Sequence, residues 1–238
     1  MKFLELADLD TVNNALSFDA DDCRIRGKCE LYTTKSTNSD KKLFKAIENR
    51  CQEDLFALSS SKSPEYAFSL TQQSPFGPLD QSSSRRTFMY IVATLNASYP
   101  DHDFSSLQPT DFYKEPSLSR VVDSVNSTLN NIGRGRLSVN GIWEIIDRHI
   151  NLSDCSVYSY TPDSDSDPYG DDALIWGMSY FFFNKNMKRM LYLSLHGLGK
   201  EVSGRNRYGN DDDSVFTPLA DDAEPSDFDD DWVANMDD

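Results

Sequence analysis

Between residues 24 and 31, charged residues alternate with apolar or small ones, and this alternation restricts the fold more than any other feature of the chain. The charged members are Arg24, Arg26, Lys28 and Glu30, and those between them are Ile25, Gly27, Cys29 and Leu31. A period of two residues is that of a β-strand, whose successive side chains point to opposite faces of a sheet. One apolar face and one charged face indicate a strand of a half-covered antiparallel sheet.

Helix-like and strand-like patterns follow one another along the rest of the chain. Apolar residues recur at helical spacing in 9–16, 43–55, 85–98, 117–132 and 138–150, and strand-like stretches occupy 155–160, 174–183 and 188–196. Asp8 is the candidate N-cap of the first helix, and Ser39 or Asp40 that of the second. Helices grouped between strands, with three strands together at the end, predict an α+β fold: a single-domain sandwich with a central antiparallel sheet packed by helices.

The predicted core is interrupted by a serine-rich stretch and followed by an acidic one. Residues 59–84 contain nine serines and show no periodicity, so residues 58–84 are predicted to form a mobile linker. Residues 205–238 are predicted to be a disordered acidic tail. Residues 1–57 and 85–204 are then expected to form one globular core domain, because the strand predicted in the first segment is too little to fold alone.

The charge of the chain bears on its partners. The formal net charge is −16, and twelve acidic residues with no Lys or Arg lie in 210–238, which leaves 27 acidic against 23 basic residues elsewhere. Cationic contacts to phosphates supply most of the affinity of DNA-binding proteins, so direct sequence-specific DNA binding is not expected. The tail either only keeps the chain soluble or contacts a partner. Phe228 and Trp232 are its candidate contact motif, since residues four apart share one face of a helix.

The cysteines and the apolar stretches indicate the compartment. The four cysteines form no CxxC pair and have no zinc-type spacing, so reduced thiols are expected, with no metal and no other cofactor. No apolar stretch has the length of a signal peptide or a transmembrane span. We therefore expect a protein of the nucleus and cytoplasm without a membrane partner.

A polar cluster follows the third predicted helix. Pro100 disfavours helical geometry at the residue before it, so Asp101, His102 and Asp103 fall on a loop just beyond the helix end. These groups could form a metal site or an acid–base pair, or the carboxylates could cap backbone amides. Capping of backbone amides is the favoured interpretation, because the other histidines are far away in the sequence. Pro100 and Phe104 are expected to anchor the loop, and the three polar residues to contact a partner.

Catalytic motifs are missing from the sequence. It contains no GxSxG, HExxH, P-loop or dinucleotide-binding glycine motif. We therefore expect no enzyme, and no catalytic or metal-ligating residue is assigned. The competing hypothesis is a small metal-dependent hydrolase or transferase that uses Asp101, His102 and Asp103, and the metal content of the purified chain distinguishes the two.

Three cations cluster between the last two predicted strands. Lys185, Lys188 and Arg189 lie at the turn of a predicted hairpin. They could be a solvated turn that prevents edge-to-edge strand pairing, a nuclear import signal, or a contact for an acidic partner surface. We include them among the candidate partner-binding residues.

Two serine–proline pairs lie in the predicted linker. Ser63 and Ser74 are therefore candidate sites for proline-directed phosphorylation. The sequence Arg85-Arg86-Thr87 lacks the arginine spacing of a basophilic kinase site.

Three stretches of the chain closely resemble the signature boxes of one family. The first runs from Met1 to Lys35, the second from Leu95 to Ser105 and the third from Trp176 to Arg189. Their sequences and their order are similar to those of the Maf-one family of RNA polymerase III repressors. The resemblance implies a central antiparallel sheet packed with helices, in agreement with the fold predicted from the patterns.

The resemblance also implies a function and a set of partners. It implies a repressor that binds RNA polymerase III at its clamp region and blocks the engagement of transcription factor IIIB. Control by nutrient signalling is expected, with regulatory kinases and phosphatases as further partners and shuttling between nucleus and cytoplasm.

Overall fold

The computed structural model describes residues 1–60, 74–133, 139–162, 168–169 and 174–200. All of them belong to one compact unit. The expectations for Ser63, Phe228 and Trp232, for residues 61–73 and for the tail from residue 205 lie outside the described residues. Across the described part of the chain, no helix is both long enough and apolar enough to cross a membrane.

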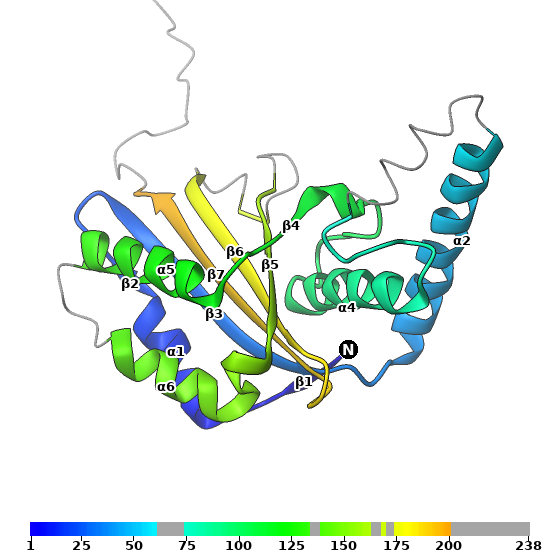
Figure 1. Cartoon of the computed structure of the whole chain (residues 1–238). Helices are drawn as coiled ribbons and strands as arrows, with labels where there is room; N and C mark the ends of the chain where they lie inside the picture. The colour runs from blue at the N-terminus through cyan, green and yellow to red at the C-terminus, as the bar shows by residue number, and fades with distance from the viewer. Residues whose placement is uncertain (61–73, 134–138, 163–167, 170–173, 201–238) are drawn as a thin grey trace, which may run out of the picture. The chain divides into compact units, whose positions relative to one another are not determined.

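An antiparallel sheet forms the centre of the fold (Figure 1). Its strands in the described residues are β1 (Lys2–Leu4), β2 (Phe18–Asp19), β3 (Cys23–Thr33), β4 (Phe112–Lys114), β5 (Ser156–Tyr160), β6 (Leu174–Asn184) and β7 (Arg189–Gly199). The order across the sheet is β1-β3-β7-β6-β5-β4, and β2 pairs with β3 at the side. The first signature box thus supplies β3, which lies beside β7, the strand that begins at the end of the third box.

The predicted strand at 24–31 is confirmed as the middle of β3. Its burial alternates, with Ile25 and Cys29 almost fully buried and Arg24 and Arg26 exposed. The whole of β3 pairs with β7, from Cys23 opposite Gly199 to Thr33 opposite Arg189. The local pattern therefore predicted both the strand and its inward face.

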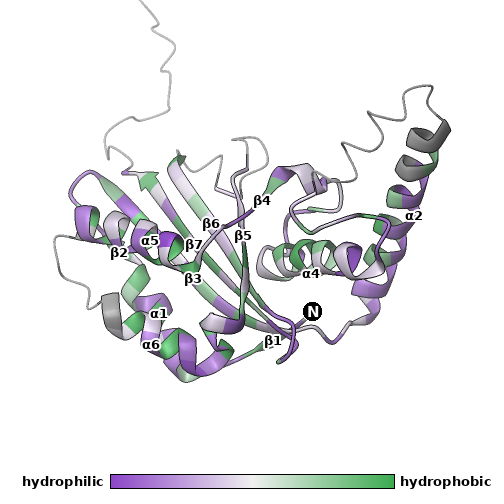
Figure 2. Cartoon of the chain, viewed as in Figure 1, coloured by the Kyte–Doolittle hydropathy of each residue, from purple (hydrophilic) through white to green (hydrophobic). Residues whose placement is uncertain are grey.

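Helices cover both faces of the sheet, and two separate apolar clusters form the core. One cluster joins the sheet to α1 (Ala7–Leu16), α5 (Leu118–Gly133) and α6 (Val139–Ile150), and the other joins it to α2 (Asn38–Ser60) and α4 (Ser82–Ser98). The 3₁₀ turns η1 (Pro109–Asp111) and η2 (Leu152–Asp154) complete the described elements. The helices carry both hydrophobic and hydrophilic positions, as helices packed on one side require (Figure 2). The predicted α+β single-domain sandwich is confirmed.

The expectation of a half-covered sheet needs correction. The end of α4 lies over the charged side of β3, where the Lys28 ammonium donates a hydrogen bond to the Ser98 carbonyl oxygen at 2.7 Å. Glu30 is also partly buried and accepts a 2.8 Å hydrogen bond from the Tyr32 hydroxyl. Polar side chains therefore do not mark a free face, because each of these charges has a partner that replaces water.

The serine-rich segment is ordered at both of its ends. The helix α2 continues to Ser60, and residues 74–81 form turns that lead into α4. Phe76 packs in this region against Phe88, Phe112 and Tyr158, with ring centroids 4.9–5.7 Å apart. One aromatic side chain that packs in the core thus holds a stretch whose composition alone predicted a linker.

Two helix starts differ from the predicted caps. The residue before α1 is Leu6, which makes no side-chain capping hydrogen bond, and the Asp8 carboxylate instead lies 2.6 Å from Nε2 of His149 on α6. At the start of α2, Asp40 accepts a hydrogen bond from the Thr37 backbone N–H at 2.6 Å, and Thr37 Oγ1 accepts one from the Asp40 N–H at 3.3 Å. Thr37 is therefore the cap, and Asp40 is the acidic member of a capping box.

Candidate functional site

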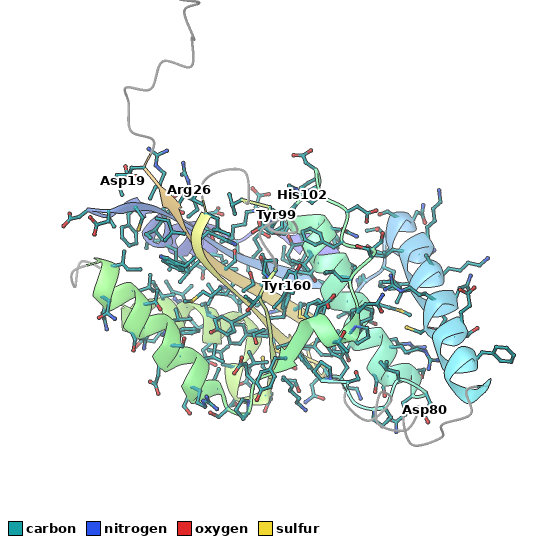
Figure 3. The ribbon with its side chains drawn as sticks, turned by 90° about the horizontal axis from the view of Figure 1, so that it is seen from above. Asp19, Arg26, Asp80, Tyr99, His102 and Tyr160 are labelled. Atoms are coloured by element: carbon teal, nitrogen blue, oxygen red, sulfur yellow. The ribbon has the colours of Figure 1, made fainter. Side chains whose placement is uncertain are left out.

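The loop that follows α4 presents its charged residues to solvent. The helix ends at Ser98, and the next N–H, that of Tyr99, still donates to the Leu95 carbonyl oxygen at 2.9 Å. The three polar residues 101–103 and Pro100 are exposed, whereas Phe104 is only 4% exposed. His102 and Tyr99 lie close together at this end of α4 (Figure 3). Phe104 is thus buried beneath the loop, as an anchor would be, whereas Pro100 is exposed.

Hydrogen bonds from two helices fix the backbone of this loop. The side-chain oxygen of Asn96 accepts from the Phe104 N–H at 2.9 Å. From α2, the guanidinium of Arg50 donates to the carbonyl oxygens of Ser105 and Leu107 at 2.7 and 2.6 Å. Neither Asn96 nor Arg50 was predicted as a site residue, and only the position of Asn96 in the second box could have indicated it.

The three polar residues of the loop differ in their local roles. Asp103 Oδ1 accepts the Ser105 N–H at 2.9 Å, and hydrogen bonding by the Ser105 side chain and then by its backbone lowers the pKa of the Asp103 carboxyl. The His102 ring stacks on Phe104 with centroids 6.1 Å apart. No group of three or more His, Cys, Asp or Glu side chains that could hold a metal occurs among the described residues. The loop is thus built to display charge, with Asp103 as a backbone cap.

The three signature boxes meet behind the loop, at Tyr99. The Lys28 ammonium from the first box lies 3.8 Å from the centroid of the Tyr99 ring in the second. The Tyr99 hydroxyl is 3.3 Å from that of Tyr192, which in turn is 3.2 Å from Ser179 Oγ in the third box. Burial lowers the pKa of Lys28 and raises that of Tyr99. The boxes therefore form one buried polar network that positions the exposed loop.

Replacing Arg50 with methionine is expected to lower the free energy of unfolding by about 2–3 kcal/mol, because two hydrogen bonds from a charged donor are lost. Chemical denaturation measures this change. Replacement of Lys45, an exposed residue of the same helix, is the matched control and should change the stability by less than about 0.5 kcal/mol. Faster amide exchange at residues 103–107 should accompany the Arg50 change, and unaltered exchange there would show that Arg50 does not hold the loop.

The hairpin cations lie at the opposite end of α4 from the loop. The turn between β6 and β7 is organised by Asn184, whose side chain donates to the Ile150 carbonyl oxygen at 2.8 Å and accepts from the Met187 N–H at 2.9 Å. Lys188 adopts a left-handed backbone conformation with φ 54°, and the guanidinium of Arg189 donates to the His149 carbonyl oxygen. Arg189 therefore has a structural partner, whereas Lys185 and Lys188 are exposed.

A groove of about 830 Å³ opens beside this turn. Its lining combines the turn with the end of β3 and the first turns of α4. The lining residues are Thr33, Thr34, Lys35, Ser82, Ser83, Arg86, Thr87, Tyr90, Phe183, Lys185, Met187, Lys188 and Arg189. Every charged residue in this set is a cation. The sequence analysis named three of the five and missed Lys35 and Arg86, which no local motif connects with the hairpin.

The predicted partner-binding residues consequently form two surfaces. The loop residues follow the C-terminal end of α4, and the hairpin cations surround its N-terminal end. With a rise of 1.5 Å per residue, the 17 residues of α4 span roughly 24 Å. The two groups therefore do not meet in one pocket, and a single small ligand cannot contact both.

Exposed charged groups held on a rigid frame are typical of proteins that bind other macromolecules. A comparison with family models identifies the family within this class of protein, since residues 25–194 match the Maf1 regulator model. The chain belongs to the Maf1 family.

Curated relatives and solved structures agree with this assignment. A Dictyostelium discoideum protein named repressor of RNA polymerase III transcription is 29% identical over 99% of both chains. The repressor of RNA polymerase III transcription MAF1 of Saccharomyces cerevisiae is 44% identical over a matched region that covers 51% of this chain and 30% of that protein. A crystal structure of citrus MAF1 is 26% identical, with a TM-score of 0.58, and the match covers 81% of this chain and 98% of that one.

Proposed function

We propose that this chain is a repressor of RNA polymerase III transcription that acts by binding the polymerase. The observation that carries the proposal is the match of residues 25–194 to the Maf1 regulator model, which includes most of β3, the loop after α4 and most of the β6–β7 hairpin. The full-length similarity to the Dictyostelium repressor supports it.

The proposed mechanism is competition for one surface. The exposed loop Pro100–Ser105 contacts the clamp region of the polymerase, and the bound repressor prevents the engagement of transcription factor IIIB. A rigid loop suits this role, because a preorganised contact loses less conformational entropy on binding. The degree of repression then follows mass action between the repressor and the initiation factor.

Capture of purified RNA polymerase III on the immobilised full chain tests this mechanism. The polymerase should bind without added factors, and increasing amounts of factor IIIB should release it. Failure of the polymerase to bind would overturn the proposal. Capture that factor IIIB leaves unchanged would overturn the competition.

Replacing Asp101 with alanine is expected to weaken polymerase binding and to spare stability, because this carboxylate is exposed on the loop. Titration of the polymerase against the labelled chain measures the first effect, and thermal unfolding the second. Asp123→Ala is the matched control, since Asp123 is an exposed carboxylate on α5. A folded Asp101→Ala chain that binds as tightly as the control would remove this residue from the contact surface.

Regulation by phosphorylation belongs to the same proposal. Nutrient-dependent kinases and phosphatases act on the serine-rich segment and shift the chain between nucleus and cytoplasm, with Ser63 and Ser74 as the candidate sites. Ser74 is only 8% exposed, and its Oγ accepts the Phe76 N–H at 3.3 Å. Phosphorylation there requires local opening, so it should also loosen the packing of Phe76. Alanine at both serines should abolish the response of localisation to a nutrient shift, and an unchanged response would exclude these two sites.

A further inference from the structure

The groove beside the β6–β7 turn concentrates positive charge on a chain that is strongly acidic as a whole. Five cations line it and no acidic residue does, although the formal net charge of the chain is −16. The cations come from three separate segments: Lys35 follows β3, Arg86 lies on α4, and the other three belong to the hairpin. The convergence therefore depends on the tertiary fold.

Most of these cations are available to a ligand. Lys35, Lys185 and Lys188 are exposed and form no ion pair within the described part of the chain. The nearby carboxylate of Glu48 is bound by Arg85, whose guanidinium lies 2.8 Å from it, and Arg86 exerts only a minor effect on the pKa of Glu48.

Neutral donors line the same groove. The Thr33 hydroxyl is buried and has no hydrogen-bond partner among the described groups. Thr33 is among the residues that line the groove. A buried hydroxyl without a partner is costly, and a bound acceptor would remove that cost.

The start of α4 adds further donors. Its first turn contains no acidic residue, and the preceding Gln81 makes no side-chain capping hydrogen bond. The first N–H groups of a helix have no intrahelical acceptor and carry a partial positive charge. Ser82 and Ser83 of this turn line the groove, so its amides add to the hydroxyl and ammonium donors there.

We propose that this groove binds the phosphate group of a phosphorylated serine or threonine in a partner protein, a role beyond repression of the polymerase. A phosphate monoester carries about −1.5 to −2 charges and three strong acceptor oxygens, which match four available cations together with hydroxyl and amide donors. A carboxylate offers one charge and two oxygens and leaves donors unused. A nucleic acid is disfavoured, because a polyanion is repelled by the net charge of the chain.

The test uses the full chain and a labelled peptide of glycine and alanine residues around one phosphoserine. Its binding is followed by fluorescence anisotropy, beside twin peptides with serine or glutamate at the same position and beside a single-stranded RNA oligonucleotide. The phosphopeptide should bind at least about tenfold more tightly than each of the other probes, a difference of about 1.4 kcal/mol. Equal binding of the glutamate twin, or tighter binding of RNA, would overturn the proposal.

Variants of the groove then locate the site. Lys185→Gln combined with Lys188→Asn removes two cations, and asparagine tolerates the left-handed backbone at position 188. This pair should weaken phosphopeptide binding by about tenfold or more, since hydrogen bonds between charged groups are the strong ones. The control pair Lys114→Gln and Arg120→Gln removes two exposed cations from β4 and α5 and should leave the affinity unchanged.

Two further measurements on the unaltered chain test the site without any variant. The phosphopeptide should slow amide exchange at residues 82–87 of the unaltered chain, and protection confined to other segments would contradict the assignment. Inorganic phosphate should compete only at much higher concentration than the peptide. Equal affinity for free phosphate would overturn the assignment to a partner segment.

Discussion

Replacing Phe104 with alanine is expected to lower the free energy of unfolding by about 3–5 kcal/mol, the usual cost of removing a buried aromatic ring. Phe104 is 4% exposed, and its ring lies 6.1 Å from those of Tyr99 and His102. The lost ring would leave a cavity under the loop, and only the hydrogen bonds of Asn96, Arg50 and Asp103 would then hold the backbone there. Denaturant titration measures the change.

The same substitution should also impair polymerase binding, because the charged residues of the loop would no longer be held in place. Tyr113→Ala is the control, since Tyr113 is an aromatic residue that is 60% exposed on β4. It should change the stability by less than about 0.5 kcal/mol. A Phe104→Ala chain as stable as this control would show that the ring does not anchor the loop.

Gly27→Ala is the second change with a large expected effect. A Cβ atom at this position would lie 2.3 Å from the Leu16 Cβ and 2.7 Å from the Leu16 carbonyl oxygen, far inside the 3.5–4.0 Å of ordinary carbon contacts. This steric clash is relieved only if the end of α1 moves away from β3. We expect a loss of about 3 kcal/mol or more, the upper end of the cost of overpacking.

The neighbouring position supplies the control for Gly27. Arg26→Ala changes an exposed residue on the other face of β3 and should be nearly neutral. Thermal unfolding of both variants measures the difference. A Gly27→Ala chain that unfolds within a degree or two of the Arg26→Ala chain would show that α1 is not packed as closely as the structure has it.

The fold could be predicted where a local pattern carries the information. The alternation from Arg24 to Leu31 predicted β3 and its buried face, because burial in a strand repeats every two residues. The close approach of α1 to Gly27 could not be predicted in this way, since it depends on which helix packs at that point of the sheet. The Asp8 side chain failed as a predicted cap for the same reason, since its partner His149 is 141 residues away.

The candidate sites show the same division between local and tertiary information. Pro100 marked the end of a helix, so the exposed position of the loop followed from the sequence. Arg50, which holds that loop from 55 residues away, left no signal in the chain. The groove likewise depends on the pairing of Thr33 with Arg189, which brings Lys35 to the hairpin.

Transcription by purified RNA polymerase III tests the proposed repression most directly. The assay contains the polymerase, its initiation factors and a template for this polymerase, and the full chain is added before the factors assemble. The transcript should fall as the chain is added and recover as factor IIIB is added in excess, as competition by mass action requires. Transcription by RNA polymerase II should be unaffected. An undiminished transcript at a concentration of folded chain that saturates binding to the polymerase would contradict the proposed function.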